Sequence, residues 1–371
     1  MIHTCRHCDA HLSERFLDLG HAPLSNAYLD AAGLQAAEVT YPLRLNVCTA
    51  CRLVQTEDYT SAADVFGADY AYFSSTSSGW VAHAKRYTDM IVERLDLGPD
   101  SFVIELAAND GYLLQHMKAA GVPCLGVEPT TATADAARAK GIEIIEDFFS
   151  MALVETLTAE GKSADLILGN NVYAHVPDIN DFTRAIATAL KPEGMVTLEF
   201  PHLMRMVEHR QFDTVYHEHF SYLSLMTVQR IFETNGLRVV DVEELPTHGG
   251  SLRVYGCRAD ASHVASGNVA SVLAEERTRG MDTPAFYEGF QAEAEAVKDA
   301  AVRFLLDAKR DGKAVAGYGA AAKGNTLMNF AGIRPDLLPR VHDAALAKQN
   351  MFLPGSHIPI LAPSALDDAR P

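Results

Sequence analysis

Long apolar runs and an excess of basic residues are both missing from this sequence. No stretch of about twenty consecutive apolar residues occurs, so we expect no membrane-spanning helix. No basic segment followed by an apolar one stands at the N-terminus, so no signal peptide is indicated. Lys and Arg number 31 against 48 Asp and Glu, a net charge of −17, which disfavours sequence-independent binding to nucleic acid or an anionic membrane. The sequence therefore predicts a cytoplasmic protein with neither kind of partner, and nothing in it fixes an oligomeric state.

The glycine motifs of the common nucleotide-binding folds are missing as well. A dinucleotide-binding loop needs G-x-G-x-x-G, because only glycine lets the backbone approach a pyrophosphate. Residues 105–111, at the end of a predicted strand, carry acidic and amide residues instead. The order Lys323-Gly324 also differs from a P-loop, in which Lys follows Gly and precedes Ser or Thr. A dehydrogenase is therefore disfavoured, although Gly317-x-Gly319 is half of a dinucleotide motif.

Cysteine is scarce, and most of it is concentrated in one pattern. Four of the six cysteines form two C-x-x-C pairs: Cys5, Cys8, Cys48 and Cys51. Two such knuckles supply the tetrahedral shell of a structural Zn²⁺ site, which leaves no open position for a substrate. The alternatives are a redox dithiol, or replacement of one thiolate by His3, His7 or His11. A redox pair normally occurs singly at a helix start, and four cysteines already complete the shell.

Strand and helix patterns alternate from residue 101 onward. Apolar runs predict strands at 102–106, 124–128, 142–145, 164–168 and 195–200, with helices between them. This order predicts a doubly wound parallel sheet. Two further strands, at 237–242 and 251–257, have no helix between them and should form an antiparallel pair at one edge. Such a sheet is the architecture of class I S-adenosylmethionine-dependent methyltransferases.

The last third of the chain predicts a second, smaller α/β domain. A long amphipathic helix is expected over 284–311, with one apolar face formed by Phe290, Ala294, Val297, Ala301 and Phe304. A strand, turn and helix follow over 314–326, and the domain is expected to be incomplete because another strand would be due after residue 371. We expect a zinc module at 1–65, a methyltransferase domain at 66–260 and a C-terminal Rossmann-like domain at 261–371.

Polar residues stand at the ends of four predicted strands, where a doubly wound sheet binds its ligand. Carboxylates without a glycine fingerprint suit a cationic ligand that lacks phosphate, such as S-adenosylmethionine. Glu128 has the position that grips ribose hydroxyls, while Asp147 and Phe148 follow the third strand and suit adenine. The residues expected to bind the cofactor are Glu105, Asn109, Asp110, Gly111, Glu128, Asp147, Phe148 and Asn170.

Ionisable and aromatic residues crowd the segment after the fifth strand. Tyr216, His217, Glu218 and His219 are consecutive, and such a group is costly to bury without a function. His175 is expected at the same end of the sheet. A metal held by His217 and His219 is an alternative, but no further ligands can be identified for it.

At these residues the sequence resembles the deoxysugar C-methyltransferases of antibiotic sugar biosynthesis. The resemblance covers nearly the whole chain, and its motifs are the two C-x-x-C knuckles, Asp69–Ser75, Asn109–Gly111, Asn170–Val176, Glu199–His202, Tyr216–Tyr222, Thr247–Arg253 and Lys323–Thr326. It implies the three domains given above. It also implies methylation of a carbon next to the ketone of a nucleotide-linked 4-keto sugar, with dTDP as the expected nucleotide. The chain departs from the family at Ala321, where members often have proline, and at 343–346.

The residues fit enolate chemistry, in which a base removes a proton from the carbon next to the ketone. His219 is the expected base and Tyr70 the second candidate. Glu218 would orient His219 or bind a sugar hydroxyl, and Tyr216 and His175 are candidate donors to the ketone oxygen. The nearest rival is an O- or N-methyltransferase, which would not need this crowded set. An RNA methyltransferase with a zinc ribbon is opposed by the acidic net charge.

Overall fold

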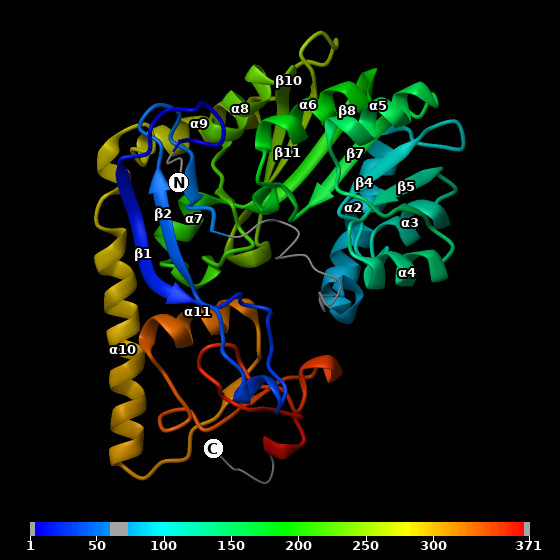
Figure 1. Ribbon diagram of the computed structural model, residues 1–371. Coiled ribbons are helices and arrows are strands. Elements are labelled where there is room, and N and C mark those ends of the chain that lie inside the picture. Colours follow the sequence, from blue (N-terminus) through cyan, green and yellow to red (C-terminus); the bar gives the residue numbers. More distant parts are fainter. Residues whose placement is uncertain (1–3, 60–72, 367–371) are drawn as a thin grey trace.

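A seven-stranded sheet forms the centre of the computed structural model, which describes residues 4–59 and 73–366 (Figure 1). Its strand order is β10-β11-β8-β7-β4-β5-β6, and its strands are β4 (Val103–Leu106), β5 (Cys124–Val127), β6 (Glu143–Ile145), β7 (Ala164–Asn170), β8 (Leu190–Pro201), β10 (Leu237–Leu245) and β11 (Ser251–Arg258). Strands β4 to β8 pair in parallel, whereas β11 is antiparallel to both β8 and β10. The predicted doubly wound sheet with an antiparallel edge pair is confirmed.

Helices cover both faces of this sheet. They are α2 (Ser78–Leu95), α3 (Leu114–Ala119), α4 (Thr131–Ala139), α5 (Met151–Ala159), α6 (Ile179–Ala189), α7 (Leu203–Glu208), α8 (Leu225–Thr234) and α9 (Gly267–Thr278). One buried apolar cluster includes residues of α2 and α3, and a second includes residues of α5, α6, α8 and α9. Local sequence sets the helix starts: the Ser224 side chain and Thr227 form a capping box at the start of α8. Within the described residues, no helix combines the length and apolarity that a membrane crossing requires.

A second sheet joins the N-terminal segment to a strand from much later in the chain. Its antiparallel strands are β1 (Glu14–Ala22), β2 (Tyr41–Val47), β3 (Val54–Thr56) and β9 (Ser221–Tyr222). Gln55 pairs with Ser221 and Val54 with Tyr222. The segment that ends in His219 therefore runs directly into the sheet of the cysteine module. The boundary predicted at residue 65 stays a prediction.

The C-terminal unit contains a small parallel sheet and two helices. Its strands β12 (Gly317–Tyr318), β13 (Val341–His342) and β14 (Ile360–Leu361) lie in that order, beside α10 (Phe290–Arg310) and α11 (Ala322–Ala331). Short 3-10 turns complete the described chain: η1 (Gly33–Gln35), η2 (Ser74–Thr76), η3 (Tyr173–His175), η4 (Phe212–Thr214), η5 (Thr247–Gly249), η6 (Pro284–Tyr287) and η7 (Leu346–Lys348). Figure 1 shows α10 running along one side of the molecule, past β1 and α11.

The single helix predicted over 284–311 is wrong in two details. Gly289 adopts φ +85°, a left-handed conformation that favours glycine, and separates η6 from α10. Phe304 is 67% exposed, whereas the neighbouring Leu305 is buried at 7%. The first half of α10 packs on the main core through Phe290, but the second half packs on the C-terminal cluster through Leu305. Because the two halves of α10 pack against different apolar clusters, one continuous apolar stripe does not describe both.

Candidate active site

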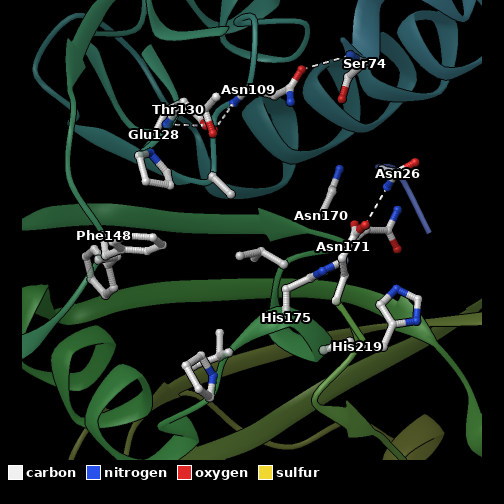
Figure 2. Close-up of a pocket in the computed structure, with 18 of the residues that line it drawn as sticks. Asn26, Ser74, Asn109, Glu128, Thr130, Phe148, Asn170, Asn171, His175 and His219 are labelled. Carbon is white, nitrogen blue, oxygen red and sulfur yellow. Dashed lines mark hydrogen bonds between the residues drawn. The ribbon is translucent and has the colours of Figure 1, made fainter. Parts of the chain in front are cut away.

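A cavity of about 550 Å³ lies at the carboxyl ends of the central strands, and all three parts of the chain line it (Figure 2). Among the residues predicted from the sequence, its lining includes Asn109, Glu128, Asp147, Phe148, Asn170, His175, Tyr216, Glu218 and His219. The N-terminal module adds Asn26, and the C-terminal unit adds Lys323 and Lys348. The structure therefore brings five of the eight predicted cofactor residues and four of the five predicted catalytic residues into one cavity. Tyr70, the second candidate base, lies outside the described residues.

Glu128 is held rigidly at the end of β5. Its Oε2 accepts a hydrogen bond from the Asn109 backbone amide at 2.9 Å, and its Oε1 accepts from the Thr130 amide at 3.0 Å and the Thr133 hydroxyl at 3.1 Å. Asn109 has φ +50°, and its side-chain oxygen accepts from the Ser74 amide at 2.8 Å. Figure 2 shows the hydrogen bonds of Glu128 with Asn109 and Thr130, and that of Asn109 with Ser74. The carboxylate is therefore held in place by contacts within the protein itself, which is the preorganisation expected of a binding residue.

The other predicted residues of this loop, Glu105, Asp110 and Gly111, lie behind the cavity wall. Burial, with the nearby charges of Glu128 and Asp110, raises the pKa of Glu105 well above its usual value. Asp110 is 3.4 Å from the Lys140 ammonium. Gly111 has φ +71°, and a Cβ there would collide with a buried isoleucine side chain. These three residues shape the loop, and its surface toward the cavity is formed by Ala107 and Asn109.

Asn170 is a buried polar residue of the cavity lining, at the end of β7. It is 9% exposed and lines the cavity, yet neither atom of its side-chain amide has a hydrogen-bond partner within the described ranges. A buried amide without partners costs free energy unless a ligand or water pairs with it. Phe148, 42% exposed, supplies an aromatic surface farther along the same wall. The carboxylate, aromatic ring and amide on this wall are groups that could hold S-adenosylmethionine.

His219 is held in one tautomer. Its Nδ1 donates to the Thr214 carbonyl at 2.9 Å, so the lone pair of the neutral ring is on Nε2. Burial, and secondarily the neighbouring His175, lowers the pKa of His219 well below its usual value. The Tyr216 and His175 rings lie 4.1 Å and 4.6 Å from its own, measured between ring centres. His219 is therefore a neutral imidazole with an available acceptor, the form that a general base requires.

The side chains near His219 in sequence or in space, those of His175, Glu218 and His217, have different surroundings. Burial lowers the pKa of His175 to about 4, which keeps this ring neutral. Glu218 lines the cavity, and its Oε1 accepts from the Asn26 side-chain amide at 2.5 Å. His217 donates to the Pro42 carbonyl at 3.2 Å and, unlike His219, does not line the cavity. In the described part of the chain, the one group of potential metal ligands found is the cysteine cluster.

Several lining residues were given no individual role from the sequence, although Asn171 was noted beside Asn170 at the end of the fourth predicted strand. Trp80 stacks on Tyr112, and the side-chain amide of Asn171 lies 2.9 Å from His248 Nε2. His248 has φ +52° within the turn η5. His248 and Lys323 belong to motifs quoted in the sequence resemblance but had no assigned role. Asn26, in contrast, stands in no motif, so only the fold reveals it.

The four cysteines predicted to bind zinc converge at one end of the second sheet. The Sγ atoms of Cys5, Cys8, Cys48 and Cys51 all lie within 4.8 Å of one another, and none forms a disulfide. The pairs Cys5–Cys51 and Cys8–Cys48 are each 3.5 Å apart. A tetrahedral Zn²⁺ with bonds of about 2.3 Å separates its sulfur ligands by roughly 3.8 Å. The Gln55 side-chain amide donates to Cys5 Sγ at 3.2 Å, a contact that suits a thiolate ligand.

Three family models match the chain in succession. Residues 5–66 match a family described as "Putative zinc binding domain", residues 80–242 a "Methyltransferase domain", and residues 246–371 a "C-methyltransferase C-terminal domain". These matches agree with the cysteine cluster, the class I methyltransferase sheet and the C-terminal unit seen in the structure.

Similar proteins include two curated methyltransferases. The C-methyltransferase NovU of Streptomyces niveus is 34% identical over 362 residues, covering 98% of this chain and 86% of that protein. A ubiquinone biosynthesis O-methyltransferase of Bartonella tribocorum is 28% identical over 95 residues, covering 25% of this chain and 38% of its own. Among solved structures, magnesium protoporphyrin IX methyltransferase of Synechocystis PCC 6803 matches 48% of this chain and 85% of its own, with 14% identity and a TM-score of 0.38. The near full-length similarity to NovU shows that this chain belongs to the S-adenosylmethionine-dependent C-methyltransferases.

Proposed function

We propose that the protein methylates the carbon next to the ketone of a nucleotide-linked 4-keto deoxysugar through an enolate. The observation that carries this proposal is the fixed tautomer of His219 in the cavity that also contains Glu128 and Asn170. A proton acceptor and a cofactor site in one cavity are what carbon methylation requires, because the C–H bond must be ionised beside the methyl donor. S-adenosylmethionine would supply the electrophilic methyl group.

Each catalytic side chain has a role in this mechanism. His219 Nε2 takes the proton from the substrate carbon, and the electron pair moves onto the ketone oxygen. A buried imidazole of lowered pKa is a weak base, so the enolate needs a hydrogen-bond donor, and we assign this to the Tyr216 hydroxyl. Because Thr214 holds the Nδ1 side of His219, we assign Glu218 to a sugar hydroxyl rather than to orienting His219. His175 is the other candidate donor, and Tyr70 remains the alternative base.

Positive charge at one end of the cavity supports an anionic substituent on the acceptor. Lys323 lies in the first turn of α11, and Ala321 and Ala322 at the N-terminus of this helix line the cavity as well. Lys348 lines the cavity too, with its ammonium 2.9 Å from the Ala320 carbonyl. Two ammonium groups beside a helix N-terminus suit a diphosphate in a chain whose net charge is otherwise strongly negative. We therefore propose a nucleoside diphosphate sugar, with dTDP as the nucleotide.

A panel of acceptors tests the reaction. With labelled S-adenosylmethionine, we expect transfer to dTDP-linked 4-keto sugars and none to the corresponding 4-hydroxy sugars, whose C–H bond is not activated by a ketone. Mass spectrometry and NMR of the product should place the methyl group on carbon. A methyl group found on oxygen would instead identify the rival O-methyltransferase and end the enolate proposal.

The cofactor assignment predicts a loss of affinity in Glu128→Ala. Because a hydrogen bond to a charged group contributes about 1.5–3 kcal/mol, S-adenosylhomocysteine should bind roughly 10–100-fold more weakly. Titration calorimetry measures this directly. Glu143→Ala, on the exposed surface of the neighbouring strand β6, is the matched control and should bind as the wild type does. Tight NADH binding by the wild type, with no response to S-adenosylhomocysteine, would contradict the assignment.

A further inference from the structure

Two buried polar side chains on α11 contact the backbone on both sides of the catalytic residues. The Thr326 hydroxyl donates to the Val215 carbonyl at 2.8 Å, and the Asn325 side-chain amide donates to the Ser25 carbonyl at 2.6 Å. Asn325 and Thr326 are 1% and 2% exposed. Neither lines the cavity, although Lys323 on the same helix does. Their contacts are therefore with the chain itself and not with a ligand.

The contact of Thr326 is made in the middle of the segment that holds His219. Val215 stands between Thr214, whose carbonyl fixes the tautomer of His219, and Tyr216, whose carbonyl accepts from the His219 backbone amide at 3.0 Å. Within this segment, the Val215 amide bonds to the Phe212 carbonyl at 3.0 Å. A shift of residue 215 therefore moves Thr214 and Tyr216, the two residues whose carbonyls contact His219.

The contact of Asn325 reaches the other side of the same group. Ser25 precedes Asn26, whose amide donates to Glu218 Oε1 at 2.5 Å. Adjacent residues of one helix thus fix the partner of Glu218 and the backbone that fixes His219. Packing also attaches α11 to this segment, because the Phe330 ring packs edge to face on the Phe212 ring, with 5.5 Å between the ring centres. Figure 1 shows α11 directly below the end of β1.

We propose that Asn325 and Thr326 are positioning residues, through which the C-terminal unit sets the geometry of residues 214–219. The inference rests on the proposed function, because it assumes that this segment carries the base and the donor. It gives the C-terminal unit a part in the chemical step that is separate from binding the acceptor. Misplacement of catalytic groups by about 1 Å can cost up to about 100-fold in rate.

Thr326→Val tests the proposal, because it keeps the side-chain shape and removes the hydroxyl. We expect kcat, and the exchange of the acceptor proton into deuterated water, to fall together by about 10–100-fold. The affinity for S-adenosylhomocysteine should stay unchanged, because the contacts of Glu128 and Asn109 are made elsewhere. Thr326→Ser, which restores the hydroxyl, should recover most of the rate. Asn325→Ala is the second variant. It leaves Thr326 unchanged and should lower kcat in the same way.

Asn329→Ala is the matched control on the same helix. Its side-chain amide donates to the Asn325 and Pro354 carbonyls, at 2.9 Å and 3.1 Å, and so makes contacts only inside the C-terminal unit. It should change thermal stability without the loss of kcat. If Thr326→Val keeps the wild-type kcat, or if Asn329→Ala loses as much, the positioning role is wrong.

Hydrogen exchange of backbone amides separates this inference from the proposed function. In Thr326→Val without any substrate, the amides of residues 214–219 should exchange faster than in the wild type, while those of β4 and β5 should not. If the wild type methylates no keto sugar, the proposed function fails, yet faster exchange in this segment still supports the attachment to α11. Unchanged exchange would overturn it.

Discussion

His219→Ala is expected to lower kcat by about 10²–10⁴-fold, the usual cost of removing a general base. The physical reason is the tautomer fixed by Thr214, which leaves Nε2 as the acceptor in the cavity. In deuterated water, the wild type should exchange the proton next to the ketone when S-adenosylhomocysteine completes the site. His219→Ala should lose this exchange in step with methylation, because both need the same ionisation. NMR of the recovered acceptor measures the exchange.

Two variants make this result specific. His217→Gln keeps a donor for the Pro42 carbonyl and changes a histidine that turns away from the cavity, so it should retain the wild-type rate. Tyr70→Phe tests the second candidate base. If Tyr70→Phe abolishes the exchange while His219→Ala leaves it intact, the two assigned roles are reversed.

The pH dependence of kcat should reflect the burial of His219. The reactive form is the neutral imidazole. Burial lowers the pKa of His219, so this ring becomes protonated only at a lower pH than an exposed histidine does. Activity should therefore stay constant as pH falls through about 6.5, the ordinary pKa of histidine, and decline only at lower pH. A decline centred at or above that value would show that a different group is the base.

Cys51→Ser is expected to have the largest effect on folding. We propose that the cysteine cluster binds one structural Zn²⁺, and apparent binding free energies of such sites are about 10–16 kcal/mol at neutral pH. Loss of one thiolate should release the metal and unfold the module. Because β9 is a strand of the same sheet, residues just after His219 should lose their pairing with β3, so activity should fall as well. Elemental analysis and thermal unfolding measure the two effects.

The matched control for the zinc site is another thiol. Cys124→Ser changes a partly buried cysteine of β5 that lies outside the cluster, and it should retain one zinc per chain. Wild-type protein without zinc, or with a disulfide inside either pair, would contradict the assignment. Strong chelators should reproduce the effect of Cys51→Ser in the wild type.

The sequence predicted the central sheet well because its buried parallel strands are continuous apolar runs. β8 is the exception, since it begins at Leu190 and not at the predicted residue 195. The first residues of β8 include the charged Lys191 and Glu193. Because this end of the strand is partly exposed to solvent, it lacks the run of apolar residues from which a buried strand is predicted. The long strand β1 was missed for a related reason, because its exposed and buried positions do not alternate regularly.

The site was predictable where one short motif carries the chemistry, and unpredictable where distant segments meet. Glu128 and His219 stand at strand ends or in dense polar clusters, which the sequence shows directly. Asn26 contacts Glu218 across 192 residues, and no local pattern records that contact. Phe304 shows the opposite error, since a regular apolar spacing predicted burial for a side chain that the fold leaves exposed.

The attachment of residues 212–222 on three sides restricts how the acceptor preference of such an enzyme can be changed. The segment pairs with β3 at one end, contacts α11 at the other, and reaches Asn26 through Glu218. If residues 212–222 alone were replaced by the equivalent loop of a relative, that loop would lack its matching contacts with β3, α11 and Asn26. Chimeras should therefore exchange the segment together with residues 24–28, β3 and α11. By the same reasoning, substitutions in these four places should be found together when the sequences of relatives diverge.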